Sequence, residues 1–186
     1  MEVKLGVSNR HVHLSEEILE ILFEGELTKK RDLIQTGHYA SNETVDIKTD
    51  KGIIKNVRVL GPIRNYTQVE ISKTDAYKLG INPPVRDSGD LKNAEKITIV
   101  SETNEVTVEE CCIIANRHIH LTPKDVEKYG LEGQEKVSVE TPGIKGGILN
   151  NVFLKVDESF TLELHLDTDD ANANLLKTGD VLKVIK

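Results

Sequence analysis

The sequence predicts a mainly β protein built from two small β-barrel domains that are capped by short α-helices. Three observations lead to this fold class. Apolar residues alternate with period two in many short segments, which is the pattern of half-buried strands. The expected helices are too short to serve as the crossovers of a parallel α/β sheet. One seven-residue motif also occurs twice, which indicates that a structural unit has been duplicated.

The strands are predicted from the alternation, in order along the chain and at spacings typical of sandwiches and barrels. They cover residues 43–48, 53–60, 69–71, 97–100, 106–108, 137–139, 152–156, 161–166 and 181–185. Asp50, Lys51 and Gly52 are predicted to form the turn between the first two strands, because such residues favour tight turns.

Four short helices are predicted between the strands, each from a capping residue and a stop. Ser15 and Thr122 are expected to cap helices over residues 16–23 and 123–129, and Pro123 suits the first position of the second. The other two helices are expected from residue 72 or 74 to 79 and from 168 to 177. The glycines expected just after the four helices are Gly25, Gly80, Gly130 and Gly179, since glycine favours helix ends.

Length and composition describe a globular protein of one or two domains. We expect a first barrel over residues 1–112 and a second over 113–186, with the N-terminal strand a candidate to pack with the second barrel. No apolar run approaches the ~20 residues that cross a bilayer, and no signal segment opens the chain, so a cytoplasmic protein is expected. The adjacent Cys111 and Cys112 lie in an apolar stretch and are read as buried structural thiols.

Charge is unevenly distributed along the chain. The formal net charge of −7 argues against a general nucleic-acid binder. Lys29, Lys30 and Arg31 nevertheless form a basic cluster, and residues 51–69 contain basic residues and no acid. Such a stretch could bind an anionic ligand, or it could be a solvated strand face protected by lysines. Charge alone leaves both interpretations open.

The repeated motif carries the strongest chemical signal. Asn-Arg-His-Val-His-Leu-Ser at residues 9–15 returns as Asn-Arg-His-Ile-His-Leu-Thr at residues 116–122. Alternate side chains of a strand share one face, so each His-x-His pair directs both imidazoles the same way. Surface decoration or a buried hydrogen-bonded pair could explain one copy, but packing alone seldom requires the same seven residues twice. Imidazole is the commonest metal ligand, so we expect a metal site where the two strands meet at the barrel interface.

Two further residues are candidate members of this site. His165 alternates with leucines and is followed at once by a predicted helix, a corner at which binding sites often form. Glu70 is a carboxylate between Val69 and Ile71, and alternation alone would make it a solvent-facing residue. His38 has no such context and receives no predicted role.

Taken together, the motifs closely resemble the PduL-type phosphate propanoyltransferases, a family of phosphotransacylases. The resemblance runs from about residue 4 to the C-terminus. Its four motifs are residues 9–15, residues 61–72 with Gly-Pro-Ile-Arg and Gln-Val-Glu-Ile-Ser, residues 116–122, and residues 163–172. The resemblance implies two helix-capped β-barrels with two zinc ions in an active site between them.

The resemblance also implies roles for individual residues. His11 and His13 would hold one zinc, which also takes the sulfur of CoA. The second zinc would be held with water or phosphate by Glu70, His118, His120 and His165. Arg64 would be the catalytic residue that binds phosphate. The residues expected to bind CoA are Ser8, Arg31, Arg58, Leu60 and Asn172. Arg31 is taken from the basic cluster of residues 29–31, in which the family's CoA-binding lysine aligns with either Lys29 or Arg31.

The implied reaction converts acyl-CoA and phosphate into acyl phosphate and CoA, by direct attack of phosphate on a zinc-polarised thioester. Acetyl- and propanoyl-CoA differ by one methylene, which a pocket separates by only ~1–3 kcal/mol, so the acyl chain is left open, as are the native metal and the oligomeric state. No nucleic acid or membrane partner is implied. Members packaged in microcompartments carry an N-terminal extension that this sequence lacks, which favours a cytoplasmic enzyme over a packaged enzyme of propanediol degradation.

Two alternative functions are compatible with parts of the pattern. A cupin-like metal enzyme uses His-x-His with a nearby glutamate on a barrel, but Glu16 and Glu17 fall on a predicted helix. A non-catalytic zinc or CoA-binding module would keep the histidines, yet it gives no reason for an arginine and a glutamate six residues apart at Arg64 and Glu70. Metal analysis combined with an assay of thiol release separates these three functions.

Overall fold

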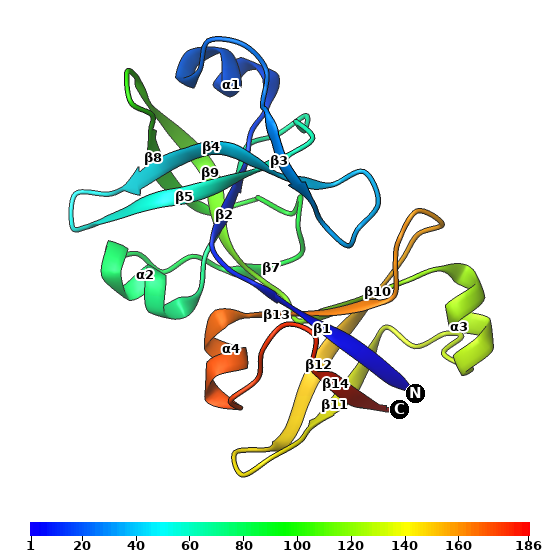
Figure 1. Ribbon diagram of the computed structural model, residues 1–186. Helices are drawn as coiled ribbons and strands as arrows, with labels where there is room; N and C mark the ends of the chain where they lie inside the picture. Colours follow the sequence, from blue (N-terminus) through cyan, green and yellow to red (C-terminus); the bar gives the residue numbers. More distant parts are fainter. The chain divides into compact units, whose positions relative to one another are not determined.

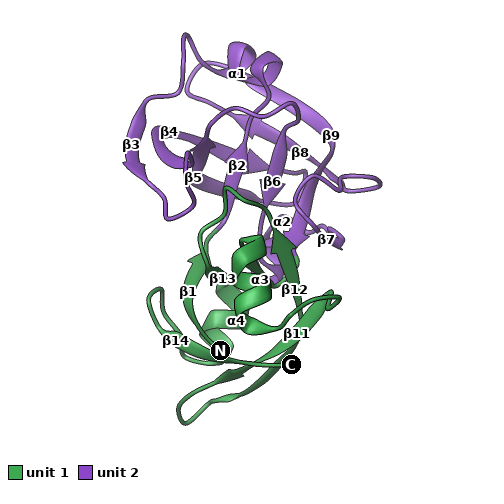
Figure 2. Ribbon diagram, turned by 90° about the vertical axis from the view of Figure 1, so that its right-hand side faces the viewer, with its two compact units in different colours: residues 1–9, 116–186 green, residues 10–115 purple.

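A computed structural model describes residues 1–186 and divides the chain into two compact units. We call residues 10–115 the first barrel, and residues 1–9 with 116–186 the second barrel (Figure 2). The mainly β fold with two barrels and four short helices confirms the predicted fold class. The two units divide between residues 9 and 10 and between residues 115 and 116, and residues 1–9 carry the N-terminal strand that was a candidate to pack with the second barrel.

The first barrel closes through six strands in the order β2, β5, β4, β8, β9 and β6, with β6 pairing back to β2. Strands β3 and β7 extend it at β4 and β9 (Figure 1). The elements are β2 (His11–His13), α1 (Glu16–Leu22), β3 (Lys29–Asp32), β4 (Tyr39–Lys48), β5 (Ile53–Gly61), β6 (Gln68–Glu70), α2 (Lys73–Leu79), β7 (Val85–Arg86), β8 (Glu95–Val100) and β9 (Glu105–Ala115).

The second barrel closes in the order β1, β13, β10, β12, β11 and β14, with β14 pairing back to β1. Its elements are β1 (Glu2–Ser8), β10 (His118–Leu121), α3 (Pro123–Tyr129), β11 (Lys136–Thr141), β12 (Gly147–Val156), β13 (Glu163–Asp167), α4 (Thr168–Ala173) and β14 (Val181–Ile185). None of the helices in the structure is long and apolar enough to span a membrane.

The two barrels share one topology. The His-x-His strand pairs in parallel with one neighbour and antiparallel with the other, both for β2 with β5 and β6 and for β10 with β12 and β13. Each of the remaining strands also has a counterpart in the same place: β4 and β11, β8 and β14, β9 and β1. A duplicated unit, predicted from the repeated motif, is therefore visible in the strand order.

The repeats exchange their first strands. β1 precedes β2 in the chain but pairs with β13 and β14, and β9 precedes β10 but pairs with β6 and β8. Each repeat thus contributes its first strand to the barrel of the other repeat. Alternation in β1 buries Val3 and Leu5 in the core of the second barrel, where the N-terminal strand was a candidate to pack.

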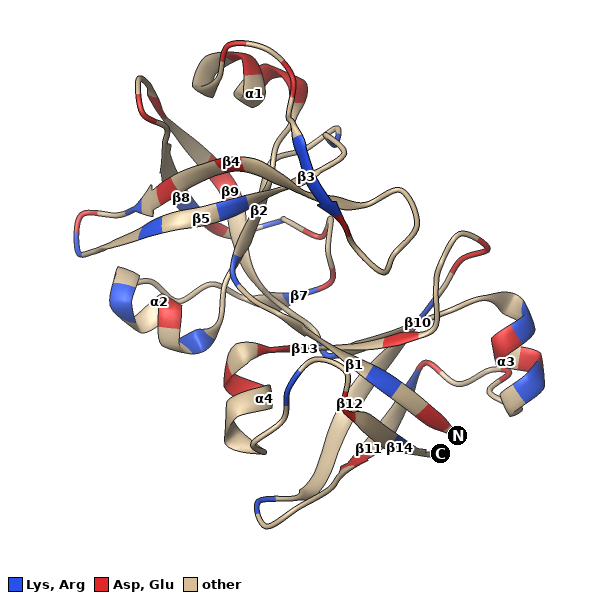
Figure 3. Ribbon diagram, viewed as in Figure 1, with Lys and Arg blue, Asp and Glu red and all other residues tan.

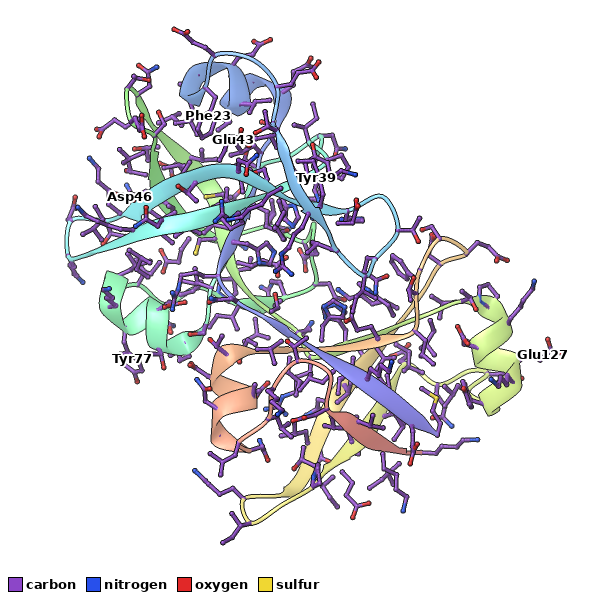
Figure 4. The ribbon with its side chains drawn as sticks, in the orientation of Figure 1. Phe23, Tyr39, Glu43, Asp46, Tyr77 and Glu127 are labelled. Atoms are coloured by element: carbon purple, nitrogen blue, oxygen red, sulfur yellow. The ribbon has the colours of Figure 1, made fainter.

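Local signals explain the helix boundaries. The Ser15, Ser72 and Thr122 side chains each accept the backbone N–H three residues on, which satisfies a donor that the helix cannot pair. α4 ends at Ala173, four residues before the expected end, and Leu175 follows with a φ of 57°. Tyr77 on α2 is 78% exposed and extends away from the ribbon in Figure 4, so the opposite face of this helix covers its barrel.

Each barrel has its own hydrophobic core. The central residues of the two His-x-His strands, Val12 and Ile119, are fully buried in the first and second cores respectively. Cys111 and Cys112 are buried free thiols in the first core, as predicted. Burial raises the pKa of the Cys111 thiol to about 12, so this residue is not an activated nucleophile.

Candidate metal centres

The first group of possible metal ligands lies in the first barrel and consists of His11, His13 and Glu70. β2 and β6 pair antiparallel with His11 opposite Glu70 and His13 opposite Gln68, so these side chains share one face of the ladder. Ligand atoms of the three residues all lie within 4.8 Å of one another. Their side chains are largely enclosed, with exposures of 9% for His11 and 12% for Glu70, and His11 Nε2 lies 3.5 Å from Glu70 Oε2.

The second group lies in the second barrel and consists of His118, His120 and His165. β10 and β13 pair antiparallel with His118 opposite His165 and His120 opposite Glu163. Ligand atoms of the three histidines again lie within 4.8 Å of one another. Their ring centroids are 4.6 to 4.9 Å apart, and the rings of His118 and His165 are stacked. This group is partly exposed, unlike the first.

The face on which the histidines lie follows from strand alternation. Val12 and Ile119 point into the two cores, so the imidazoles on either side of each must point away from the barrel interior. In β13, Leu164 and Leu166 are buried in the core, and this sends Glu163 and His165 to the opposite face, as the sequence predicted.

The donor atoms in both groups fit a metal ion. Burial, His11 and Arg64 together lower the pKa of His13 well below its usual value, which favours the neutral imidazole that binds metals. His13 Nδ1 is buried without a hydrogen-bond partner, a costly state that an ion would relieve. His118 Nδ1 lies 2.7 Å from the Asn116 carbonyl. Because that oxygen can only accept, the ring donates from Nδ1, and its lone pair is on Nε2, the tautomer in which a backbone carbonyl orients a ligating histidine.

Arg64 lies beside the first group. Its backbone N–H donates to the Leu14 carbonyl at 2.9 Å, which fixes the segment after β5 against the end of β2. Nη1 of its guanidinium donates to Tyr66 Oη and Ser88 Oγ, both at 2.9 Å. Both Nη1 hydrogens are therefore used, and the edge formed by Nε and Nη2 is left to bind an anion in the bidentate manner that suits phosphate.

The residues two positions before Glu70 and His165 differ between the groups. Gln68 is fully buried, and its Nε2 donates to Glu70 Oε1 at 2.6 Å. Glu163 is 3% exposed, and its Oε2 lies 2.9 Å from His165 Nε2. A Cβ on Gly6 would lie 2.7 Å from Glu163 Oε1, so a glycine at this position makes room for the carboxylate. Neither Gln68 nor Glu163 was among the predicted site residues.

The arginine of each repeated motif forms a bidentate ion pair with the aspartate at the third position of a helix. Arg10 contacts Asp75 of α2, with both nitrogen–oxygen distances 2.8 Å, and Arg117 contacts Asp170 of α4 at 2.6 and 2.7 Å. These helices follow directly after β6 and β13. Each ion pair therefore ties the His-x-His strand to the strand that supplies the third ligand. The repetition of Arg10 and Arg117 within the heptads was the signal for this role.

The residues predicted to bind CoA divide between the two barrels. Arg31 is exposed on the edge strand β3, whose basic residues are visible in Figure 3. Across the sheet, Arg31 lies opposite Ala40, which lies opposite Leu60. Arg58 Nη1 donates to the Ser41 and Asn42 carbonyls. In the second barrel, Ser8 at the end of β1 lies opposite Asp167, the N-cap of α4, the helix that contains Asn172.

The structure regroups one predicted ligand. The resemblance assigned Glu70 to the second ion with the histidines of the second barrel, whereas its carboxylate lies in the group of His11 and His13. The reason is the antiparallel register of β2 and β6, which spans almost sixty residues of chain and has no local signature. His38, which received no predicted role, belongs to neither group. Burial and the nearby charge of Arg64 lower its pKa.

Comparison with known proteins gives consistent matches. The model of the phosphate propanoyltransferase family matches residues 4–177. The phosphate propanoyltransferase of Thermotoga maritima is 53% identical over 186 residues, covering 98% of this chain and 88% of that protein. The phosphate propanoyltransferase of Priestia megaterium is 51% identical over 180 residues, covering 96% and 83% respectively, and that of Rhodopseudomonas palustris is 43% identical over 187 residues, covering 100% and 83%.

Proposed function

Because this chain belongs to the phosphate propanoyltransferase family and is an acyltransferase, we propose that it is a zinc-dependent phosphotransacylase. It would interconvert propanoyl-CoA or acetyl-CoA and phosphate with the acyl phosphate and CoA. A phosphate oxygen attacks the thioester carbonyl carbon, a C–O bond forms, the C–S bond breaks, and CoA leaves as its thiolate. No acyl-enzyme is needed, in keeping with the buried, poorly ionised Cys111.

Arg64 would hold the attacking phosphate. The difficulty of the reaction is charge, since an anion approaches an anionic CoA ester on a protein of net charge −7. The Nε–Nη2 edge matches two phosphate oxygens, while Tyr66 and Ser88 fix the guanidinium plane through Nη1. Holding the nucleophile in one orientation lowers the entropic part of the barrier.

The two ligand groups would each hold one zinc ion. Imidazole and carboxylate donors suit zinc, and the buried Nδ1 of His13 supports the assignment for the first group. Zinc would act there as a Lewis acid that polarises the thioester carbonyl and stabilises the leaving thiolate. Three protein ligands in each group leave room for substrate, as in other catalytic zinc sites.

CoA would be bound by polar and basic residues of both barrels. Arg58 retains Nε and Nη2 for the phosphates of CoA, because its hydrogen bonds to Ser41 and Asn42 both use Nη1. Arg31 on the exposed edge strand β3 would add a flexible positive charge. Ser8, Leu60 and Asn172 complete the proposed CoA site.

The observation that carries this proposal is the position of Arg64. Its guanidinium is linked through Ser88 and Gln68 to Glu70, so an anion-binding side chain and a group of possible metal ligands occur together in one barrel. The alternative of a cupin-like enzyme loses support because Glu16 and Glu17 are exposed on α1 and belong to neither group. Membership of an acyltransferase family argues against a non-catalytic module.

The test is a thiol-release assay with propanoyl-CoA and phosphate, in which zinc content is measured on the same preparation. Arg64→Ala should lower kcat/KM for phosphate about 10²- to 10³-fold, the usual cost of removing one charge-stabilising donor. Arg64→Lys should restore only part of this, because a point charge replaces a planar fork. Zinc content and CoA affinity should not change.

Lys183→Ala is the control for loss of one positive charge, since Lys183 pairs with Glu140 on the exposed surface of the second barrel. Near-normal turnover of Arg64→Ala at ordinary phosphate concentration would refute the role of Arg64. Comparison of kcat/KM for acetyl-, propanoyl- and butanoyl-CoA would define the acyl group.

A further inference from the structure

A short chain of hydrogen bonds joins Arg64 to Glu70 within the first barrel. Ser88, in the loop between β7 and β8, accepts from Arg64 Nη1 and from Gln68 Nε2, both at 2.9 Å. Gln68 Nε2 also donates to Glu70 Oε1 at 2.6 Å. The anion-binding arginine and the carboxylate of the first metal group are thus separated by only two side chains.

The orientation of the Gln68 amide is determined by its partners. The Gly89 backbone N–H, which can only donate, lies 2.7 Å from Gln68 Oε1. The amide oxygen must therefore face Gly89, and both Nε2 hydrogens must go to Ser88 and Glu70. Gln68 is fully buried, so an unmade hydrogen bond here would be costly. This side chain is held by three partners at once.

The chain of bonds restricts the reactive atoms at both ends. At one end, Gln68 holds Glu70 Oε1 and thereby orients Oε2, which lies 3.5 Å from His11 Nε2. At the other end, Ser88 fixes Nη1 of Arg64 and thereby sets the plane of the Nε–Nη2 edge. An ion on Glu70 would order the chain from one side, and an anion on Arg64 would order it from the other. Ordering a shared network once lowers the cost for the second ligand.

We propose that Gln68 and Ser88 are positioning residues that couple phosphate binding at Arg64 to metal binding at His11, His13 and Glu70. Each ligand raises the affinity of the protein for the other by the same factor, as thermodynamic linkage requires. This inference rests on the proposed function, because it takes phosphate as the ligand of Arg64 and a metal as the ligand of the first group. The new element is the hydrogen-bonded link through Gln68 and Ser88, which are ligands of neither the phosphate nor the metal.

The test is a zinc titration of the full chain against a competing chelator, with and without inorganic phosphate. The titration step of the first group is the one that Glu70→Gln weakens. Phosphate should tighten this step roughly 5- to 20-fold in the native protein, within the usual range of coupling between sites. Ser88→Ala should reduce the factor to about twofold or less, and Ser88→Thr, which keeps the hydroxyl, should restore most of it.

Tyr66→Phe is the matched control. It removes the other hydrogen-bond acceptor of Arg64 Nη1 but does not touch Gln68 or Glu70, so the effect of phosphate on zinc affinity should persist. An unchanged phosphate effect in Ser88→Ala would overturn the proposal, since phosphate would then act on the metal without the network. Equal loss of the effect in Tyr66→Phe would overturn it as well, because any loosening of Arg64 would suffice.

The failure of this inference differs from that of the proposed function. If phosphate leaves zinc affinity unchanged in the native protein while Arg64→Ala still lowers kcat/KM for phosphate, only the coupling is wrong. If Arg64→Ala leaves phosphate use unchanged, the role of Arg64 in the proposed function is itself wrong.

Discussion

The two barrels place their candidate metal ligands at matching positions of the same ladder, but they distribute charge differently. The third ligand opposite the first histidine is Glu70 in the first barrel and His165 in the second. The residue opposite the second histidine is Gln68 in the first barrel and Glu163 in the second. Each barrel therefore has one carboxylate at these two positions. In the first barrel it is the candidate ligand Glu70, and in the second it is Glu163, two residues before the candidate ligand His165.

This difference shows that the duplicated backbone determines where ligands can lie, while single residues determine what each group can do. In the first group the carboxylate of Glu70 is itself a candidate ligand, and the amide of Gln68 links it to Ser88 and Arg64. In the second group the candidate ligands are three imidazoles, and the buried carboxylate of Glu163 lies beside one of them. The first group is also more buried. The two ligand groups thus have the same strand geometry but different distributions of charge.

The largest expected effect comes from removing a histidine of either group. His13→Ala and His120→Ala should each cost one zinc ion per chain and lower turnover by about 10³-fold or more, because several kcal/mol of charge stabilisation go with the ion. Elemental analysis and the thiol-release assay measure both. His38→Ala removes an imidazole that belongs to neither group and should retain both ions. If either variant still bound two ions, the assignment of one ion to each group would be wrong.

A smaller effect is expected from Glu163→Gln, which keeps the shape and removes the charge behind His165. The zinc affinity of the second group should fall about 10- to 100-fold, the usual result of losing a carboxylate that supports a ligating histidine. The affinity of the first group should not change. Chelator competition provides the measurement, and the exposed Glu158→Gln is the control. Unchanged zinc affinity would mean that Glu163 has only a packing role.

The two arginine–aspartate pairs should differ in their contribution to stability. Asp75 has 4% of its side chain exposed and Asp170 has 21%. Arg10→Ala should therefore lower the free energy of unfolding by about 2 kcal/mol and Arg117→Ala by about 1 kcal/mol, since a more buried carboxylate loses more when its partner is removed. Urea unfolding of the metal-free protein tests this order, and the exposed pair of Arg86 and Asp90 should matter least. The reverse order would contradict the comparison.

The smallest effect is a pH dependence that belongs to the first barrel. Burial chiefly lowers the pKa of His13 below 6.5, and the nearby charges of His11 and Arg64 lower it further. A group whose pKa is lower in the folded state stabilises the fold fully above its unfolded pKa, and this stabilisation is lost as the pH falls below about 6.5. Metal-free protein should therefore melt at lower temperature as the pH drops from 7 toward 5. His13→Gln should flatten this profile; an equally steep profile in that variant would assign it to other groups.

Several features of the fold could be predicted from local sequence. Strand alternation located the strands from 43–48 to 181–185, because an apolar residue on every second position must face a core. Ser15 and Thr122 were recognised as caps because their hydroxyls satisfy backbone donors that a helix leaves unpaired. β3 escaped detection because all four of its residues are exposed and carry no apolar pattern.

What the sequence by itself determined is the chemistry available to this protein: two His-x-His strands, two further candidate ligands, and an arginine able to bind phosphate. The tertiary structure alone decided their grouping. β1 completes the second barrel and β9 the first, and the register of β6 on β2 brings Glu70 to His11 and Gln68 to His13. The physical reason is that strand pairing depends on backbone hydrogen bonds between distant segments. Every residue type except proline can form these bonds, so they leave little pattern in the residues themselves.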